Sequence, residues 1–350
     1  MAFNLEKLLR PHIANIKPYS SARDEYSGKA GIFLDANENP FGSMASGSFN
    51  RYPDPYQLDI KQKLAEVKNV FDNQIFLGNG SDEAIDLLMR AFCIPGQDNI
   101  ILLPPTYGMY EVSAGINDIE IKKVNLTEDY QLRPDAILEA VNENTKIIFI
   151  CSPNNPSGNK VNRKDIYQVL DNFNGLVVVD EAYIDFSDEP SFTTELEKYP
   201  NLLVMQTFSK AWGLASLRIG MAFASEKIIK ILNLIKPPYN ISGLTQEKVL
   251  EALGNADAIH QVVKDTFVER QFLEVEVSKF PFLKKIFPSN ANFILIKVDG
   301  ARAIYEFLIE QTIIIRDRSK VVLCEDCLRV SVGTREENEA FLKALNLFKP

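Results

Sequence analysis

Between residues 74 and 224 the sequence repeats one pattern, in which a short continuous apolar run is followed by a polar or glycine-rich loop. An amphipathic stretch often comes next. The runs read QIFL, NIILL, KIIFI, LVVVD, LLVMQTF and IGMAFA. Continuous rather than alternating hydrophobicity is typical of strands buried on both faces, as in a mostly parallel sheet covered by helices. The pattern predicts a doubly wound α/β domain.

The stretches between these runs carry helix signals. SDEAIDLLMRAF, PDAILEAVNEN and NRKDIYQVLDNF have apolar residues at helical spacing. Pro134 stands where a first helical residue is expected, and Asn162 stands where an N-cap is expected. These stretches are therefore expected to cover the sheet.

A second, smaller α/β domain is expected after KPPYN at 236–240. A long helical pattern, QEKVLEALGNADAIHQVVKDTFVERQFLEVEVSKF, comes first and is expected to bridge the two domains. NFILIKV, ARAIYEFLIEQ, IIIRDR and CLRVSVG follow, and a last helix begins at Thr334, with Glu337 placed for a capping box. The expected division is an N-terminal arm with part of the small domain at 1–45, a large ligand-binding domain at 46–245 and the small domain at 246–350.

Charge and hydropathy disfavour several function classes. The formal net charge is −9 and no basic cluster offsets it, so a nucleic-acid partner is not expected. An acidic residue, Glu6, and Pro11 interrupt the N-terminal stretch where a signal peptide needs an apolar run. No run reaches the ~20 apolar residues that span a bilayer. We expect a cytoplasmic protein without a membrane partner.

Cysteine and histidine give little support for a metal site or a hydrolase. Cys324 and Cys327 form a CEDC pair that could suggest zinc, but the other candidate ligands are isolated: Cys93, Cys151, His12 and His260. Reduced thiols and no metal are expected. Neither histidine lies near a serine or cysteine in a recognisable motif, so a histidine-dependent hydrolase is disfavoured.

The loops after the predicted strands point to one binding crevice, because the carboxyl ends of parallel strands meet at one edge of a sheet. GNGSDE leads into a helix and could seat a phosphate, or could be a plain connection. PPTYGMY places Tyr107 in a constrained turn, where its ring could stack on a flat ligand or simply pack. In CSPNNPSG, Asn155 could donate to a ligand oxygen or only close its own turn.

Asp180 is the most informative of these loop residues. It follows LVVV directly, so its carboxylate is partly desolvated and needs a cation that the adjacent sequence does not offer. The next loop, TFSKAWGLASLRIG, contains Lys210, which alone would be read as a solvated surface charge. Together these groups match pyridoxal phosphate, which needs a lysine for a Schiff base and a carboxylate beside its pyridine nitrogen.

Several motifs occur in order along nearly the whole chain: KPYSSARDE, LDANENP, RYPDP, PPTYGMY, CSPNNPSG, VVVDEAYIDF, TFSKAWGLASLRIG, IIIRDR and LRVSVGTREEN. By these motifs the chain resembles the fold-type I pyridoxal-phosphate aminotransferases of class II, and among them the histidinol-phosphate aminotransferase family. The resemblance implies pyridoxal 5'-phosphate as cofactor, histidinol phosphate and 2-oxoglutarate or glutamate as substrates, and a homodimer with active sites near the subunit interface.

The resemblance also implies residue roles around the cofactor ring. Lys210 would form the Schiff base, Asp180 would pair with the pyridine nitrogen, and Tyr107 would stack on the ring. Tyr183 and Asn155 would bond its phenolic oxygen.

Further roles are implied at the two anionic ends of the site. The cofactor phosphate would be held by Ser81, Asp82, Thr207, Ser209, Arg218 and, from the other subunit, Tyr52. Arg329 would bind the substrate carboxylate or phosphate, Arg316 and Tyr19 would assist at the phosphate end, and Asn39 would lie near the substrate.

Other readings stay open at this point. Another aminotransferase of the fold, for aromatic amino acids, or a phospho-amino-acid decarboxylase would share most of these motifs. The pair Arg316 and Arg329 favours a substrate with a phosphate. A non-catalytic protein with the same fold would be expected to have lost Lys210 or Asp180, and both are present.

Overall fold

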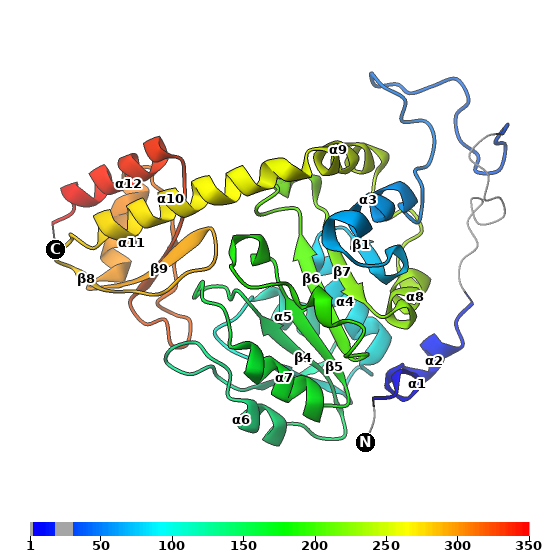
Figure 1. Ribbon diagram of the computed structural model, residues 1–350, viewed down its shortest axis with the longest axis horizontal. Helices are drawn as coiled ribbons and strands as arrows, with labels where there is room; N and C mark the ends of the chain where they lie inside the picture. Colours follow the sequence, from blue (N-terminus) through cyan, green and yellow to red (C-terminus); the bar gives the residue numbers. More distant parts are fainter. Residues whose placement is uncertain (1–2, 18–30, 350) are drawn as a thin grey trace.

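The computed structural model describes residues 3–17 and 31–349. This part of the chain contains a seven-stranded sheet in the order β1-β7-β6-β5-β4-β2-β3 (Figure 1). Neighbouring strands from β3 to β6 in this order are parallel, and β7 runs antiparallel to β6 and to β1. The strands are β1 Ile75–Gly78, β2 Asn99–Leu102, β3 Glu120–Lys123, β4 Thr145–Cys151, β5 Leu176–Asp180, β6 Leu202–Thr207 and β7 Gly220–Ala224. The predicted doubly wound, mostly parallel sheet is confirmed.

Helices cover both faces of this sheet, which explains the continuous apolar runs. In β4, Ile148 and Ile150 join one core cluster, whereas Ile147 and Phe149 join the other. Side chains alternate across a strand, so a strand covered on both faces needs apolar residues throughout. The first face is covered by α3 Leu58–Lys68, α6 Pro134–Glu139, α7 Arg163–Asn172 and α9 Gly243–Gly254, and the second by α1 Leu5–Leu8, α4 Ser81–Phe92, α5 Met109–Ile116 and α8 Glu226–Ile235.

A second, four-stranded sheet lies toward the C-terminus, in the antiparallel order β10-β11-β9-β8. Its strands are β8 Leu283–Ile286, β9 Phe293–Val298, β10 Arg316–Asp317 and β11 Cys327–Ser331. α10 Ile259–Val277, α11 Ala301–Glu310 and α12 Arg335–Leu347 pack against it in a core of their own. In Figure 1 the long helix α10 runs from the large sheet to this smaller unit.

The local helix signals place several boundaries correctly. Pro134 is the first residue of α6, and Asn162 is the N-cap of α7. Thr334 caps α12 and forms the predicted capping box with Glu337. The long helical pattern after KPPYN is broken by a short 3-10 turn at Ala256–Ala258 between α9 and α10. None of the helices in residues 3–17 and 31–349 combines the length and apolar content needed to cross a membrane.

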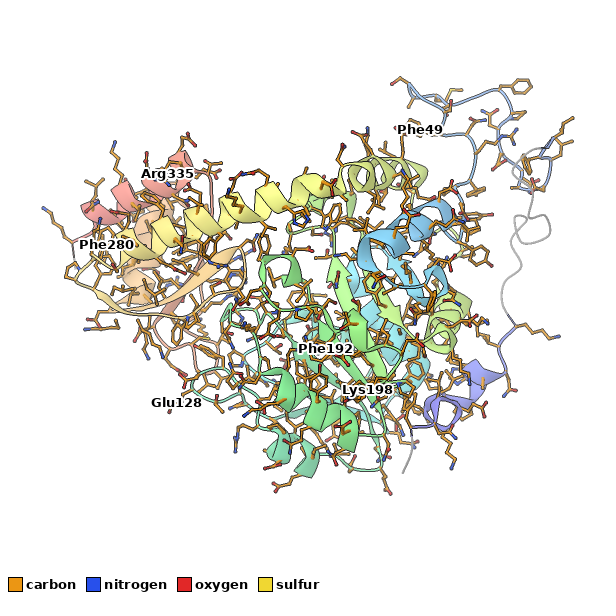
Figure 2. All side chains as sticks on the ribbon, in the orientation of Figure 1. Phe49, Glu128, Phe192, Lys198, Phe280 and Arg335 are labelled. Atoms are coloured by element: carbon orange, nitrogen blue, oxygen red, sulfur yellow. The ribbon has the colours of Figure 1, made fainter. Side chains whose placement is uncertain are left out.

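Residues 31–52, the N-terminal segment, contain no helix or strand and extend away from the large sheet (Figure 1). Several of their apolar side chains face solvent: Phe41 is 94% exposed and Met44 is 95% exposed. Phe49, labelled in Figure 2, projects from the same segment. Exposed apolar side chains that gather on one segment are typical of a surface that another chain covers.

Candidate active site

A cleft of about 950 Å³ lies between the large sheet and the small one. The last residues of β2, β4, β5 and β6 line it: Leu102, Cys151, Asp180 and Thr207. This is the carboxyl edge at which open α/β sheets bind ligands. Most of the predicted site residues line the same cleft. From the large sheet these are Ser81, Asp82, Tyr107, Asn155, Asp180 and Tyr183. The connection from β6 to β7 adds Thr207, Ser209, Lys210 and Arg218, and the small sheet adds Arg316 and Arg329.

Asp180 ends β5 and is a buried carboxylate that forms no ion pair with the part of the chain that the structure describes. Its side chain is 3% exposed. The hydroxyl of Tyr110 donates to Oδ2 at 2.5 Å, and the backbone N–H of Ala182 donates to Oδ1 at 3.1 Å. Burial raises the pKa of Asp180 to about 6, against the lowering effect of these two hydrogen bonds. No ion pair joins Asp180 to any described residue, so the site favours a ligand that brings a positive charge.

Tyr110 is a site residue that the sequence reasoning missed. It is fully buried, its ring is stacked on Phe149 at 4.7 Å, and its edge meets Tyr107 at 5.5 Å. It thus supports both the carboxylate of Asp180 and the ring of Tyr107. Tyr107 precedes α5 and Tyr110 lies in its first turn, and the occurrence of both tyrosines in the single motif PPTYGMY is the signal that could have identified the pair.

Lys210 follows β6 and lines the cleft with its amino group. Its Nζ atom lies 5.6 Å from the centre of the Tyr183 ring. The walls of the cleft partly desolvate the ammonium, which lowers the pKa of Lys210; Arg329 and Arg218 lower it further, whereas Asp180 raises it. Within the described residues Nζ has no hydrogen bond or ion pair. A lysine with a lowered pKa supplies more of the neutral amine, which is the nucleophilic form.

The first turn of α4 and Arg218 form a seat for an anion. Gly80 precedes the helix with a φ of 76°, and a Cβ atom built there would lie 3.0 Å from the Arg218 guanidinium. A Cβ on Gly220 would lie 2.2 Å from the backbone nitrogen of Ser81. Glycine at these two positions lets β7 and Arg218 approach the helix N-terminus, whose free N–H groups attract negative charge.

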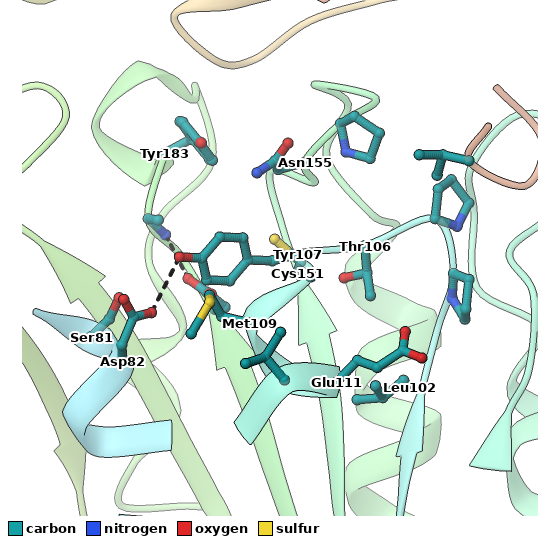
Figure 3. Close-up of a pocket in the computed structure, with 18 of the residues that line it drawn as sticks. Ser81, Asp82, Leu102, Thr106, Tyr107, Met109, Glu111, Cys151, Asn155 and Tyr183 are labelled. Carbon is teal, nitrogen blue, oxygen red and sulfur yellow. Dashed lines mark hydrogen bonds between the residues drawn. The ribbon is translucent and has the colours of Figure 1, made fainter. Parts of the chain in front are cut away.

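The aromatic and amide groups of the cleft are held by neighbours. The Tyr107 hydroxyl donates to Asp82 at 3.2 Å, and Figure 3 shows this contact with Tyr183 and Asn155 on the opposite side of the Tyr107 ring from the Asp82 helix. Arg329 donates to Oδ1 of Asn155, which leaves Nδ2 of Asn155 as a donor for a ligand. Burial raises the pKa of Tyr183, whose ring packs edge-on against Phe293 at 5.2 Å.

Two of the predicted site residues that the structure describes are not brought into this cleft. Tyr52 stacks on Tyr239 at 4.5 Å, outside the cleft. Asn39 closes a turn in the N-terminal segment by accepting from the Phe41 backbone at 3.0 Å. Tyr19 lies outside the described residues.

The residues of the cleft fit pyridoxal phosphate. The helix N-terminus and Arg218 suit its phosphate, and the ring of Tyr107 suits its flat ring. Asp180, buried and without an ion pair to any of the described residues, suits its protonated nitrogen. In residues 3–17 and 31–349 there is no cluster of histidine, cysteine and acidic side chains that could hold a metal ion, and Cys324 and Cys327 are buried free thiols.

Comparison with known proteins places the chain in a family. Residues 31–345 match the family Aminotransferase class I and II. A histidinol-phosphate aminotransferase from Cytophaga hutchinsonii is 56% identical over 99% of this chain and 100% of its own length. One from Bacteroides fragilis is 54% identical over 99% of each chain.

A solved structure shares the fold. It is a histidinol-phosphate aminotransferase from Sinorhizobium meliloti in complex with pyridoxal-5'-phosphate, with a TM-score of 0.78 and 24% identity, covering 89% of this chain and 88% of that one. The match over most of the sequence, and not the likeness of fold alone, decides the assignment. This chain belongs to the class I and II aminotransferase family.

Proposed function

We propose that this protein transfers an amino group between L-histidinol phosphate and 2-oxoglutarate, with pyridoxal 5'-phosphate as its cofactor. The observation that carries the proposal is one cleft that joins Asp180, Lys210 and Arg218 on its large-sheet side to Arg316 and Arg329 on its small-sheet side. The first group suits the cofactor, and the second suits an anionic group on the substrate. The names of the two relatives above agree with this substrate.

The large-sheet residues would hold the cofactor. Its phosphate would lie at the first turn of α4, with Ser81, Asp82, Thr207, Ser209 and Arg218 around it. Bound in this way, pyridoxal phosphate supplies an electron-withdrawing ring that stabilises negative charge on the substrate carbon.

The chain's own groups then move and hold protons. The amino group of Lys210 accepts the proton from the substrate carbon, and its lowered pKa keeps part of the lysine population in the basic form that this step needs. Asp180 holds the proton of the ring nitrogen through its carboxylate, and the Tyr110 bond favours the ionised form of that carboxylate. Asn155 and Tyr183, which line the same cleft, would bond the phenolic oxygen of the ring and so orient it.

Arg329 serves both substrates in turn. Its planar guanidinium can form two parallel bonds with a phosphate or with a carboxylate, so one side chain can accept histidinol phosphate in one half-reaction and glutamate in the other. Arg329 lies over the Phe293 ring at 5.1 Å and is held by Asn155, so its position is set before a substrate arrives.

We further infer a homodimer in which the N-terminal segment lies on the partner. Ile32 and Leu34 are 92% and 87% exposed, and Phe41 and Met44 are exposed to a similar degree. A second copy that covers these side chains would remove them from water. Tyr52, at the end of the segment, would then reach the partner's cofactor phosphate, and Asn39 and Tyr19 would approach a substrate.

A half-reaction screen tests the function. The holoenzyme is mixed with histidinol phosphate, phenylalanine or threonine phosphate, and loss of the absorbance band of the bound cofactor is followed with time. Histidinol phosphate is expected to react fastest. Fastest reaction with phenylalanine would replace the proposal by an aromatic aminotransferase, and release of carbon dioxide from threonine phosphate would replace it by a decarboxylase.

A further inference from the structure

Three arginines lie on one face of the small sheet, at the edge that meets the cleft. Arg316 in β10 stands directly opposite Arg329 in β11. The backbone N–H of Arg318 donates to the carbonyl of Cys327 at 2.9 Å, so the pairing continues one step beyond β10. Arg318 lies two residues after Arg316 and therefore on the same face. All three side chains line the cleft.

These positive charges have no acidic partner within the described residues. Burial lowers the pKa of Arg318, and Arg316 lowers it further; burial also lowers the pKa of Arg329, and Arg318 is the next largest cause. Asp317 lies on the other face, where it pairs with Arg302 at 3.6 Å. Like charges placed opposite each other destabilise a sheet, so the pairing of Arg316 with Arg329 lowers the stability of the small sheet.

Two of these arginines also have a nitrogen donor without a hydrogen-bond partner among the described residues. Nε of Arg318 and Nε of Arg329 are both buried and have no hydrogen-bond partner in the described part of the chain. Buried polar nitrogens normally have partners, and two such groups beside three uncompensated charges fit an anion with several oxygens. The seat at α4 and Arg218 is a separate one, which the proposed function gives to the cofactor.

We propose that Arg318 is a specificity-determining residue that makes the small-sheet side of the cleft select a phosphate dianion over a carboxylate. The inference rests on the proposed function and adds a residue to it. Arg329 alone can satisfy the two oxygens of one carboxylate of glutamate. A phosphate monoester carries nearly two charges at neutral pH and three terminal oxygens, and it needs the further donors of Arg316 and Arg318.

The two half-reactions distinguish a role of Arg318 in phosphate selection from a general role in activity or folding. Arg318→Gln is expected to lower kcat/KM for histidinol phosphate by about 10- to 100-fold, mainly through KM, because it removes a charge-assisted bond. The half-reaction with glutamate is expected to change by less than about twofold. Arg318→Lys restores the charge without the planar fork, so it should recover part of the loss.

Arg302→Gln is the matched control. It removes the same charge from α11, outside the cleft. There Arg302 pairs with Glu306 at 2.7 Å and with Asp317, on the other face of β10, at 3.6 Å. Its kinetics should match those of the wild type. Cofactor content and the temperature of unfolding of each variant show whether it is folded, and Arg318→Lys carries the test if Arg318→Gln is not.

A second readout does not depend on the identity of the natural substrate. Inorganic phosphate should inhibit the glutamate half-reaction of the wild-type holoenzyme, and Arg318→Gln should raise the inhibition constant by about tenfold or more, whereas Arg302→Gln should not. If the wild type does not react with histidinol phosphate, the proposed function fails, but this inhibition still tests Arg318. Equal losses in both half-reactions, or unchanged inhibition by phosphate, would overturn the inference.

Discussion

The two walls of the cleft differ in how their charges are held. On the large-sheet side, Asp180 stands at the end of a buried strand, and Tyr110 and Ala182 fix its carboxylate. On the small-sheet side, the two-residue strand β10 carries Arg316, and no carboxylate of the described residues neutralises it, Arg318 or Arg329. The large-sheet side, whose carboxylate is fixed by hydrogen bonds, suits the chemical step that all substrates share. The small-sheet side, whose arginines keep donors that no described residue uses, suits the recognition of one particular substrate.

Loss of Lys210 should be the strongest way to break the large-sheet side. Lys210→Ala removes both the nucleophile and the base, so amino transfer should fall by more than about 10⁴-fold. The absorbance band of bound cofactor, measured on purified protein supplied with excess pyridoxal phosphate, should also disappear. Lys227→Ala, at an exposed lysine of α8, is the control. A Lys210→Ala variant that keeps this absorbance band and its activity would show that the cofactor is held in another way.

Asp180→Asn should separate catalysis from stability on the same wall. Turnover should fall by about 100- to 1000-fold, because the ring nitrogen loses its anionic partner. The pKa of Asp180 is raised from 3.8 to about 6 in the folded state, so the folded protein binds this proton more tightly than the unfolded chain does. The contribution of Asp180 to stability is therefore full below pH 3.8 and is lost as the pH rises through about 6.

The stability of the Asp180→Asn variant should depend on pH, because Asp180 stabilises the folded protein only when it is protonated. Without cofactor, the variant should be more stable than the wild type at pH 8, by up to about 3 kcal/mol, and the difference should shrink at pH 4. Thermal or denaturant unfolding at the two pH values measures it. A variant that is less stable than the wild type at pH 8 would mean that the carboxylate has a structural partner.

Tyr110→Phe should act through Asp180 and give a smaller effect. The hydrogen bond from Tyr110 lowers the pKa of Asp180, so its loss should raise that pKa above about 6. Cofactor binding needs the ionised carboxylate, so the loss of affinity on acidification should begin at a higher pH in the variant. At pH 7 affinity should fall by about tenfold. Tyr107→Phe, which loses only a bond to Asp82, should leave the midpoint of this pH dependence in place.

Gly80→Ala should have the smallest effect and tests how the anion seat is built. The added Cβ would lie 3.0 Å from Arg218, at a residue with a φ of 76°. Gly300→Ala is the matched control, because Gly300 also caps a helix at positive φ, 71°, but a Cβ there meets nothing within 4 Å. Gly300→Ala should lose about 1 kcal/mol of stability, because Gly300 is left-handed helical. Gly80→Ala should lose about 1–3 kcal/mol, because a φ of 76° with a ψ of 168° is a conformation that essentially only glycine adopts. Only Gly80→Ala should also bind pyridoxal phosphate more weakly, by about fivefold, in an equilibrium titration.

The sequence predicts the buried part of the fold well and the edges poorly. Each of the six apolar runs between residues 74 and 224 forms a strand of the large sheet, because both faces of these strands are covered. β3 and β8 were not predicted: EIKK and LKKI carry lysines and are partly exposed, so their strands lack an apolar pattern. The break between α9 and α10 was also missed, since apolar residues keep a helical spacing across it. The domain division at residues 245 and 246 and the cytoplasmic location stay predictions.

In the site, too, residues that follow buried strands were predicted, whereas several residues outside those loops were not. Residues after the parallel strands line one cleft because the topology collects them at one edge. Tyr110 was missed because a tyrosine in an apolar helix resembles a core residue. Arg318 was missed because it follows a strand of only two residues, which is too short to show in the sequence which side chains share a face. Tyr52 and Asn39 lie outside the cleft of a single chain, and a sequence does not say which subunit a side chain serves.

The exposed N-terminal segment has a consequence for how activity depends on protein concentration. If Tyr52 completes the site of a second copy, a dissociated chain is an incomplete enzyme. Association is bimolecular, so specific activity should decline on dilution and return when the protein is concentrated. The amount of the chain in the cell would then set both the number of sites and the fraction of them that are competent, and output would rise more steeply than abundance.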